Sequence, residues 1–271
     1  MFKILRKSST LALSIITVIF TFVPETFFEK FKLLSNASND VNVVLTRVLT
    51  FGAILALSII LNVLYLLFRK SICIKGHNYS IKIEYGDLLE MDGCKKVINF
   101  DECFTTSIGY APSDVNVDSV CGQFLQKHTI QDIQSLINHA QLKPTRSKSK
   151  FQNKPRYESG KLVPYNDFLL MSFAKLNENG SGEMTPDEFL DCLSILWQEI
   201  DKYYGQKDVC IPILGSGVTR MGDESLTQQK LLDIIIGSYR LSTHKLKPPY
   251  QLHIVCKKSD NFSLNKINET M

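Results

Sequence analysis

An apolar run that meets two glycines, Val209-Cys-Ile-Pro-Ile-Leu-Gly-Ser-Gly-Val-Thr-Arg-Met-Gly222, determines most of what this sequence predicts. The run ends at Gly215, and its short apolar character predicts a buried strand. Glycines at the end of a strand let backbone N–H groups approach a phosphate closely. Two interpretations stay open: a phosphate cradle at Gly215-Ser216-Gly217 with Arg220 as an added contact, or a structural tight turn with Arg220 in a surface salt bridge.

Strands and helices alternate on both sides of this run. Short apolar or period-two runs predict strands at residues 79–85, 96–100, 167–174 and 251–256. Helical spacing predicts helices at residues 119–140, 185–204 and 224–240. Thr185, Pro186 and Glu188 form an N-cap, a first helical residue and a capping box. This alternation predicts an α/β fold whose sheet is covered on both faces.

The stretch from Gln141 to Lys161 breaks the alternation. It is polar and basic, contains two prolines and shows no periodicity, so it predicts a loop. Two interpretations stay open for its charge. The loop is either a solvated insertion or a contact for anionic lipid or a ligand phosphate.

Glycines and polar residues also stand at other strand and helix ends. Gly86-Asp87 follows one predicted strand, Asn99–Glu102 follows the next, and Gly122-Gln123 lies near a helix start. Ligands of open α/β sheets bind where the carboxyl ends of the strands meet. The predicted ligand-binding residues are Asp87, Asn99, Asp101, Glu102, Gly122, Gln123, Leu214, Gly215, Ser216, Gly217, Val218, Thr219 and Arg220.

The spacing of residues in the sequence gives little support for catalysis or metal binding. The five histidines show neither metal-pair spacing nor a triad motif, and no Walker A or GxGxxG loop is present. Asn177–Glu188 has the spacing of a calcium loop, yet the capping box already explains Glu188. The seven cysteines lack a CxxC pair and are expected to be buried and reduced, and the net charge of +4 does not favour nucleic acid. We predict a binding protein with no catalytic residue, metal or cofactor.

The first quarter of the chain holds the longest apolar segments. Residues 48–68 contain 21 positions without a charged side chain, which matches the ~20 residues of a membrane-spanning helix. Residues 10–28 are a second, shorter candidate, for which a cleavable signal peptide is the competing interpretation. Flanking Lys and Arg residues predict both termini in the cytoplasm. The expected organisation is a two-helix transmembrane hairpin at 1–70, an α/β domain at 71–256 and a polar tail at 257–271.

Residues 80–256 resemble a macro domain, the three-layer α/β/α module with a mixed sheet that binds ADP-ribose and its derivatives. The resemblance is carried by Lys82–Leu89, by Lys96–Asp101 and, most specifically, by Ile211–Val218. It implies that Asp87 contacts adenine and that Gly215–Thr219 wrap the diphosphate. It also implies that Asn99, Asp101 and Gln123 lie near the distal ribose or its substituent. The asparagine-rich loop is reduced to Asn99-Phe-Asp-Glu, and no multi-glycine loop precedes Gly122. In that family, hydrolysis of ADP-ribose conjugates uses groups placed by these two loops.

Together with the apolar segments, the domain resembles the membrane-anchored macro effectors of Thoeris antiphage defence. In that family a TIR-domain enzyme makes an ADP-ribose-type signal on infection, histidine–ADP-ribose in the membrane-bound branch. The macro domain binds the signal, and the membrane segments then damage the envelope. The resemblance implies a homo-oligomeric sensor in the inner membrane that triggers cell death. A membrane-tethered ADP-ribosyl hydrolase and an ADP-ribose-binding scaffold are the alternatives.

Overall fold

The chain divides into two compact units, a helical unit (Met1–Arg69) and an α/β unit (Lys70–Met271). The computed structural model describes residues 2–31, 33–34, 38–217, 219–222, 226–259 and 262–267. The division falls where the sequence predicts the apolar segments to end.

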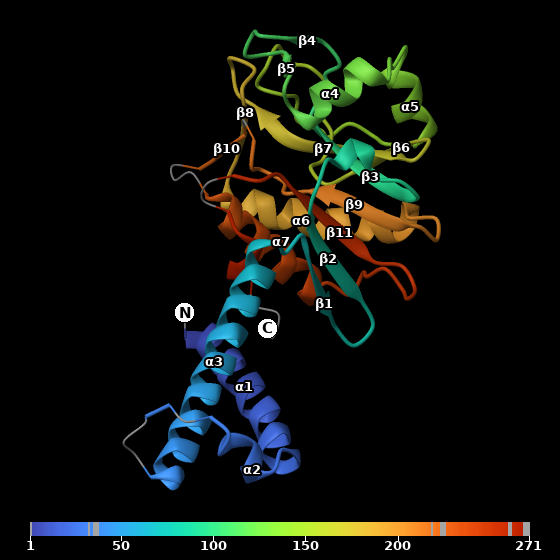
Figure 1. Cartoon of the computed structure of the whole chain (residues 1–271). Coiled ribbons are helices and arrows are strands. Elements are labelled where there is room, and N and C mark those ends of the chain that lie inside the picture. Colours follow the sequence, from blue (N-terminus) through green and yellow to red (C-terminus); the bar gives the residue numbers. More distant parts are fainter. Residues whose placement is uncertain are drawn as a thin grey trace. The chain divides into compact units, whose positions relative to one another are not determined.

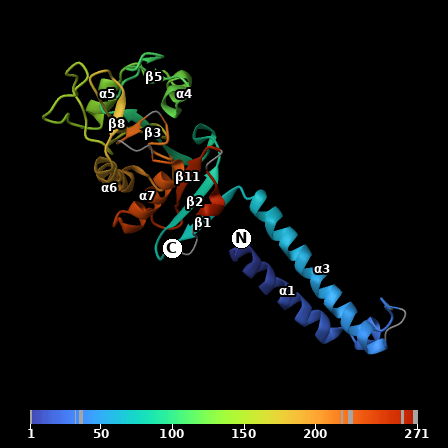
Figure 2. The ribbon, with the colours of Figure 1, turned by 90° about the vertical axis from the view of Figure 1, so that its left-hand side faces the viewer.

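Two long helices make up most of the helical unit. α1 (Phe2–Phe22) and α3 (Asn39–Leu67) lie side by side, and the short α2 (Glu25–Phe28) follows α1 (Figures 1 and 2). α1 ends before Pro24, because proline cannot donate a helical hydrogen bond. Residues 10–28 therefore do not form the single helix that was predicted. The two long helices are linked by Asn62, whose Nδ2 donates to Ser8 Oγ at 3.0 Å.

One helix of the described residues is long and apolar enough to cross a membrane. This helix is Asn39–Leu67, and most of its side chains are exposed. The apolar part of α1, Ser8–Phe22, is shorter than the ~20 residues that a crossing needs. Length and composition thus support one candidate membrane span, whereas the sequence predicts two spans.

The α/β unit is built on a mixed sheet of nine strands within the described residues. Its strands are β1 (Ser71–Lys75), β2 (Ser80–Tyr85), β3 (Cys94–Asp101), β6 (Leu162–Tyr165), β7 (Phe168–Leu176), β8 (Gly182–Met184), β9 (Asp208–Pro212), β10 (Arg220–Met221) and β11 (Leu252–Cys256). Their order is β1-β2-β11-β9-β3-β7-β8-β10, and β6 pairs with β7. β4 (Ile108–Gly109) and β5 (Val115–Asn116) form a separate parallel pair.

Five central strands are parallel, and helices cover both faces of the sheet. β2, β11, β9, β3 and β7 run in one direction. β1 is antiparallel to β2, β6 and β8 are antiparallel to β7, and β10 is parallel to β8. Along β3, Val97 packs into one core and Ile98 into the other, as the two-residue period of a strand requires. α6 (Pro186–Tyr203) and α7 (Gln228–Leu241) cover the Val97 face. η1 (Leu88–Glu90), α4 (Val120–Lys127) and α5 (Ile133–His139) cover the other, which confirms the predicted three-layer α/β/α fold.

The predicted capping box at the start of α6 is confirmed. Thr185 Oγ1 accepts from Glu188 N at 3.3 Å, and Glu188 Oε2 accepts from Thr185 N at 2.8 Å. Further along the helix, Trp197 is buried and its Nε1 donates to Ser238 Oγ of α7 at 3.1 Å. The Trp197 contact joins α6 to α7 on the face of the sheet that both helices cover.

Four features of the α/β unit differ from the predictions. The expected helix 119–140 is two helices, since α4 ends at Lys127 and Asp132 caps a new helix with its carboxylate. The helix expected from residue 224 is capped by Thr227 and begins at Gln228; residues 224 and 225 lie outside the described part. The segment predicted as a polar tail contains a short helix, η2 (Leu264–Lys266), and buries three apolar side chains in the core: Phe262, Leu264 and Ile267. Cys73 is exposed, against the expectation of burial, while the cysteines of the described residues are free thiols.

Candidate functional site

The parallel strands end at one edge of the sheet, which we call the carboxyl edge. Their register places Cys256 of β11 opposite Tyr85 of β2, and Val255 opposite Pro212 of β9. β3 pairs with β9 through Lys96 and Cys210, so Asn99 comes level with Ile213, just before the glycines. The carboxyl edge therefore gathers the ends of β2, β9 and β3, from which most of the predicted site residues come.

The glycine turn after β9 is open and carries unused donors. Gly215 has a φ of 77°, a conformation that favours glycine. Ser216 is exposed, and its N and Oγ both donate to Ile213 O within the turn, at 3.3 and 2.6 Å. Within the described residues, the amides of Gly215 and Gly217 have no protein acceptor. A Cβ added at Gly217 would meet nothing within 4 Å. The Gly215 and Gly217 N–H groups are thus unused within the described residues, and the space beside the Gly217 Cα is open.

The chain leaves this turn along the carboxyl edge. β9 and β10 are separated in the sheet by β3, β7 and β8, so the chain that leaves β9 passes the ends of these strands before it reaches β10. β10 then pairs with β8, with Arg220 opposite Glu183. The glycine turn therefore lies where the chain leaves β9 toward the end of β3, which carries Asn99 and Asp101.

The remaining residues of this segment have different positions. The side chain of Leu214 is only 1 % exposed and packs in the core, so the predicted ligand contact there is restricted to its backbone. Val218 lies outside the described residues. Thr219 is half-buried and Arg220 is exposed. Arg220 is therefore accessible to an anion.

Asp87 begins the turn that follows β2. Its Oδ1 accepts from Leu89 N at 2.9 Å and caps η1. Within the described residues its second carboxylate oxygen forms no hydrogen bond, and the side chain is half-buried. Since a carboxylate offers about four acceptor sites, Asp87 can still accept a hydrogen bond from a ligand.

Asn99 and Asp101 lie at the end of β3, where the register with β7 shifts between Phe100 and Asp101. The Asn99 carboxamide is half-buried and forms no hydrogen bond within the described part of the chain. Asp101 Oδ1 accepts from Cys103 N at 2.7 Å and from Thr105 N at 3.2 Å, which closes the turn after the strand. Burial raises the pKa of Asp101, although hydrogen bonds from Thr105 and Cys103 oppose the shift.

This raised pKa predicts a pH-dependent stability. A carboxyl group with a raised pKa in the folded state stabilises the fold most below its unfolded pKa, and this contribution falls as the pH rises through the folded pKa. Asp101→Asn keeps an Oδ1 acceptor but removes the charge. We expect the free energy of unfolding of the variant, relative to the wild type, to increase as the pH rises above about 4, the ordinary pKa of an aspartate. Urea unfolding followed by the fluorescence of Trp197 tests this, and a difference that is constant with pH would contradict it.

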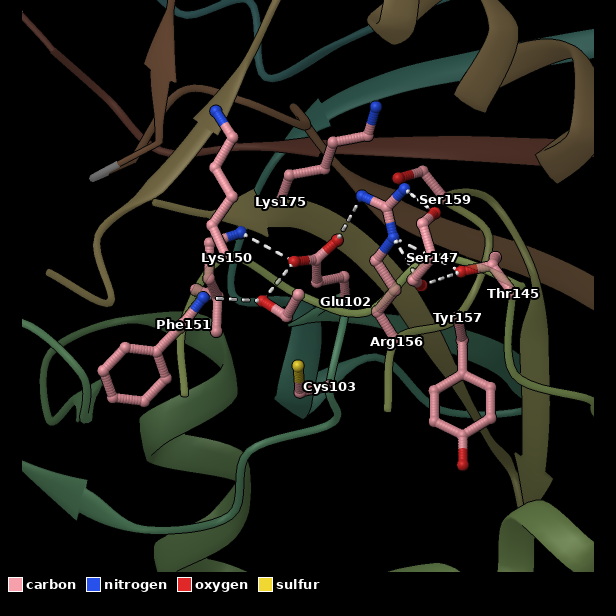
Figure 3. A network of polar contacts seen from close by, with 12 residues as sticks. Glu102, Cys103, Thr145, Ser147, Lys150, Phe151, Arg156, Tyr157, Ser159 and Lys175 are labelled. Atoms are coloured by element: carbon pink, nitrogen blue, oxygen red, sulfur yellow. Dashed lines mark hydrogen bonds and ion pairs between the residues drawn. The ribbon is translucent and has the colours of Figure 1, made fainter. Parts of the chain in front are cut away.

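Glu102 has a structural role, which corrects its predicted place among the ligand contacts. Its side chain is buried, and Oε1 accepts from Ser149 Oγ at 2.6 Å and from Leu176 N at 3.2 Å. Oε2 lies 3.4 Å from Arg156 Nη1, toward which the carboxylate points in Figure 3. Both carboxylate oxygens of Glu102 are therefore bound by the protein. The three donors come from segments that pack around the end of β3.

The same network orders the polar, basic stretch from Gln141 to Lys161, which we call the basic loop. Thr145 N donates to Arg156 O at 2.8 Å and Ser149 N to Lys154 O at 3.0 Å, so residues 145–156 fold back on themselves. Residues 141–161 contain no helix or strand, as predicted, but Ser149 and Phe151 are buried, so the loop is not solvated along its whole length. In the sequence, a serine and an aromatic residue within a lysine-rich stretch are the features that could have indicated this anchoring.

Gly122 and Gln123 are also held by the protein. A Cβ at Gly122 would lie 2.1 Å from Asn116 O, so only glycine fits this close approach of α4 to the preceding turn. Its amide donates to the cap residue Ser119, and Gln123 Nε2 donates to Asp118 O at 2.9 Å. Both residues therefore brace the start of α4, and contact with a ligand stays a prediction.

The segment with calcium-loop spacing uses its oxygens internally. Asn177 Oδ1 accepts from Asn179 N and Ser181 N, each at 3.0 Å, and Glu188 pairs with Lys175 as well as Thr185. Among the described residues, no group of three or more His, Cys, Asp or Glu side chains could hold a metal ion.

Comparison with known proteins identifies the α/β unit. Residues 81–257 match the family model described as Thoeris protein ThsA, Macro domain. Thoeris protein ThsA of Bacillus amyloliquefaciens (strain Y2) is 29% identical over 218 residues, which cover 76% of this chain and 72% of that protein.

Solved structures of an Oceanobacillus iheyensis macrodomain are also similar. A mutant of it with ADPR has a TM-score of 0.47 and 11% identity, over 70% of this chain and 91% of that chain. The same macrodomain with ADP has a TM-score of 0.45 and 12% identity, over 70% and 89%. Since the family model spans more than half of the sequence, this chain belongs to the Thoeris ThsA macro-domain family.

Proposed function

We propose that the α/β unit binds an ADP-ribose-type nucleotide as a sensor in Thoeris antiphage defence. The observation that carries the proposal is the glycine turn after β9, whose Gly215 and Gly217 amides have no protein acceptor within the described residues. Backbone N–H groups of a glycine turn at a strand end can bind the oxygens of a diphosphate. Membership of the Thoeris macro-domain family supports the same ligand class.

The proposed ligand lies along the carboxyl edge. Gly215–Thr219 hold its diphosphate, and Asp87 accepts a hydrogen bond from its adenine amino group through the carboxylate oxygen that η1 leaves unused. Asn99, whose carboxamide forms no hydrogen bond within the described residues, lies by the distal ribose, and Asp101 shapes the turn beside it. Exposed Arg220 adds positive charge next to the phosphates.

The helical unit is proposed to be the effector. α3 is the candidate membrane span, and α1 packs beside it as the second arm of a hairpin. Binding of a nucleotide made by a TIR-domain enzyme would promote clustering of several hairpins in the inner membrane and then disrupt it. Ligand drives this only if it binds the active assembly more tightly than the resting one.

The proposed activity is binding without turnover. A hydrolase would consume an ADP-ribose conjugate, whereas a sensor returns it intact. The full chain in lipid nanodiscs is titrated with ADP-ribose by calorimetry, and an ADP-ribosylated peptide is incubated with the same sample and analysed by chromatography. Saturable heat with unchanged peptide supports the sensor. Heat with release of ADP-ribose supports the hydrolase, and the absence of binding contradicts both.

A further inference from the structure

Three consecutive residues at the end of β2 connect three segments of the α/β unit. Tyr85 N donates to Lys70 O at 3.1 Å, where the chain enters this unit. Gly86 N donates to Cys256 O at 3.2 Å, where β11 ends and the C-terminal segment begins. The third residue is Asp87, the proposed adenine contact. The candidate site, the chain entry and the C-terminal segment thus meet within three residues.

The pairing of β1 with β2 explains why the chain enters here. β1 is antiparallel to β2, and Ser71 lies opposite Glu84. The first residue of β1 therefore stands at the carboxyl edge, and Lys70 precedes it. Had β1 been parallel to β2, the entry would lie at the opposite edge, away from the candidate site.

The side chain of Tyr85 is held by the C-terminal segment. Leu264 N donates to Tyr85 Oη at 3.3 Å. The Phe262 ring packs edge-on against Tyr85, with 5.9 Å between centroids and 88° between planes, and Lys258 Nζ lies 5.8 Å from the Tyr85 centroid. Phe262 and Leu264 are buried, so residues 262–267 form a strap that packs on Tyr85.

We infer that Tyr85 is a positioning residue that couples ligand at Asp87 to the chain entry at Lys70 and to the strap, residues 262–267. The inference rests on the proposed function. A nucleotide held by Asp87 restricts the backbone of residues 85–87. Because the amide of Tyr85 binds the entry and its hydroxyl binds the strap, this restriction reaches both segments. Coupling is reciprocal, so a change at the entry also alters ligand affinity.

Hydrogen exchange of the full chain in nanodiscs, with and without ADP-ribose as the probe, tests the coupling. In the wild type, ADP-ribose is expected to slow amide exchange in residues 70–75 and 262–267. Tyr85→Phe keeps the ring and the backbone but loses Oη, so protection of 262–267 by ligand is expected to disappear while that of 70–75 remains. Tyr79→Phe is the matched control. Its ring packs on Tyr239, away from the strap, and it should behave as the wild type.

The possible outcomes separate this inference from the proposed function. Calorimetric binding of ADP-ribose without ligand-dependent protection in either segment overturns the coupling and leaves the proposed function intact. Protection of the strap that is equal in Tyr85→Phe and the wild type overturns the role of Tyr85. Absence of binding overturns the proposed function, and the coupling with it. If Tyr85→Phe does not fold, Phe262→Leu, which removes the ring contact from the strap, is measured in the same way.

Discussion

Replacing Gly217 by leucine is expected to weaken ADP-ribose binding by about a hundredfold or more, which corresponds to about 2.8 kcal/mol. A Cβ at Gly217 meets no protein atom within 4 Å, so the new side chain extends into the open space beside the turn. That space is where the diphosphate is proposed to lie, and a leucine there blocks access to the amides of Gly215 and Gly217. Calorimetry of the full chain in nanodiscs measures the change.

A second glycine provides the control for this experiment. Gly237, within α7, also has no neighbour within 4 Å of an added Cβ, and α7 covers a sheet face and not the carboxyl edge. Gly237→Leu is expected to bind ADP-ribose as the wild type does. A folded Gly217→Leu protein with wild-type affinity, verified by circular dichroism, would remove the glycine turn from the site.

Replacing Glu102 by alanine is expected to lower the free energy of unfolding of the α/β unit by about 3–5 kcal/mol. The buried carboxylate accepts from Ser149, Leu176 and Arg156, so its removal leaves buried donors without an acceptor. Glu102→Gln keeps one acceptor oxygen and is expected to lose less, about 1–3 kcal/mol. Urea unfolding is followed by the fluorescence of Trp197, the single tryptophan, which is buried in this unit.

Glu183 is the matched control for Glu102. It also pairs with a cation of the basic loop, Lys150, at 3.6 Å, but both side chains are exposed. Exposed pairs contribute little, so Glu183→Ala is expected to change the free energy of unfolding by less than about 1 kcal/mol. Equal losses for Glu102→Ala and Glu183→Ala would contradict the structural role of Glu102.

Local sequence signals predicted much of this fold. The capping box at Thr185 and Glu188 involves residues three apart, so its chemistry is visible in the sequence and was confirmed in the structure. The apolar run from Val209 likewise predicted a strand followed by a glycine turn. These features depend on neighbours in the chain, and the sequence alone contains them.

The features that the sequence could not predict depend on how the folded chain packs. Glu102 stands in a polar strand end like Asp101, yet its partners Ser149, Arg156 and Leu176 lie 47, 54 and 74 residues further along the chain. The close approach of Asn116 O to Gly122 and the burial of Leu264 depend in the same way on packing. A polar pattern at a strand end therefore located the site region but did not separate ligand contacts from structural ones.

The entry of the chain at the carboxyl edge was also invisible in the sequence. Ser71–Lys75 carries alternating side chains, but its antiparallel pairing with β2 is a property of the folded sheet. This pairing brings Lys70 to Tyr85, two residues from Asp87. A ligand sensor with an apolar helical unit benefits from such an arrangement, because the ligand and the connection to that unit then act on the same strand end.

A crystal structure of the full chain grown with ADP-ribose is the most direct test that the glycine turn binds the diphosphate. Diphosphate oxygens are expected within about 3.2 Å of the Gly215 and Gly217 amide nitrogens. The adenine amino group is expected to face Asp87. A nucleotide bound away from the carboxyl edge, or an empty glycine turn at saturating ADP-ribose, would contradict it.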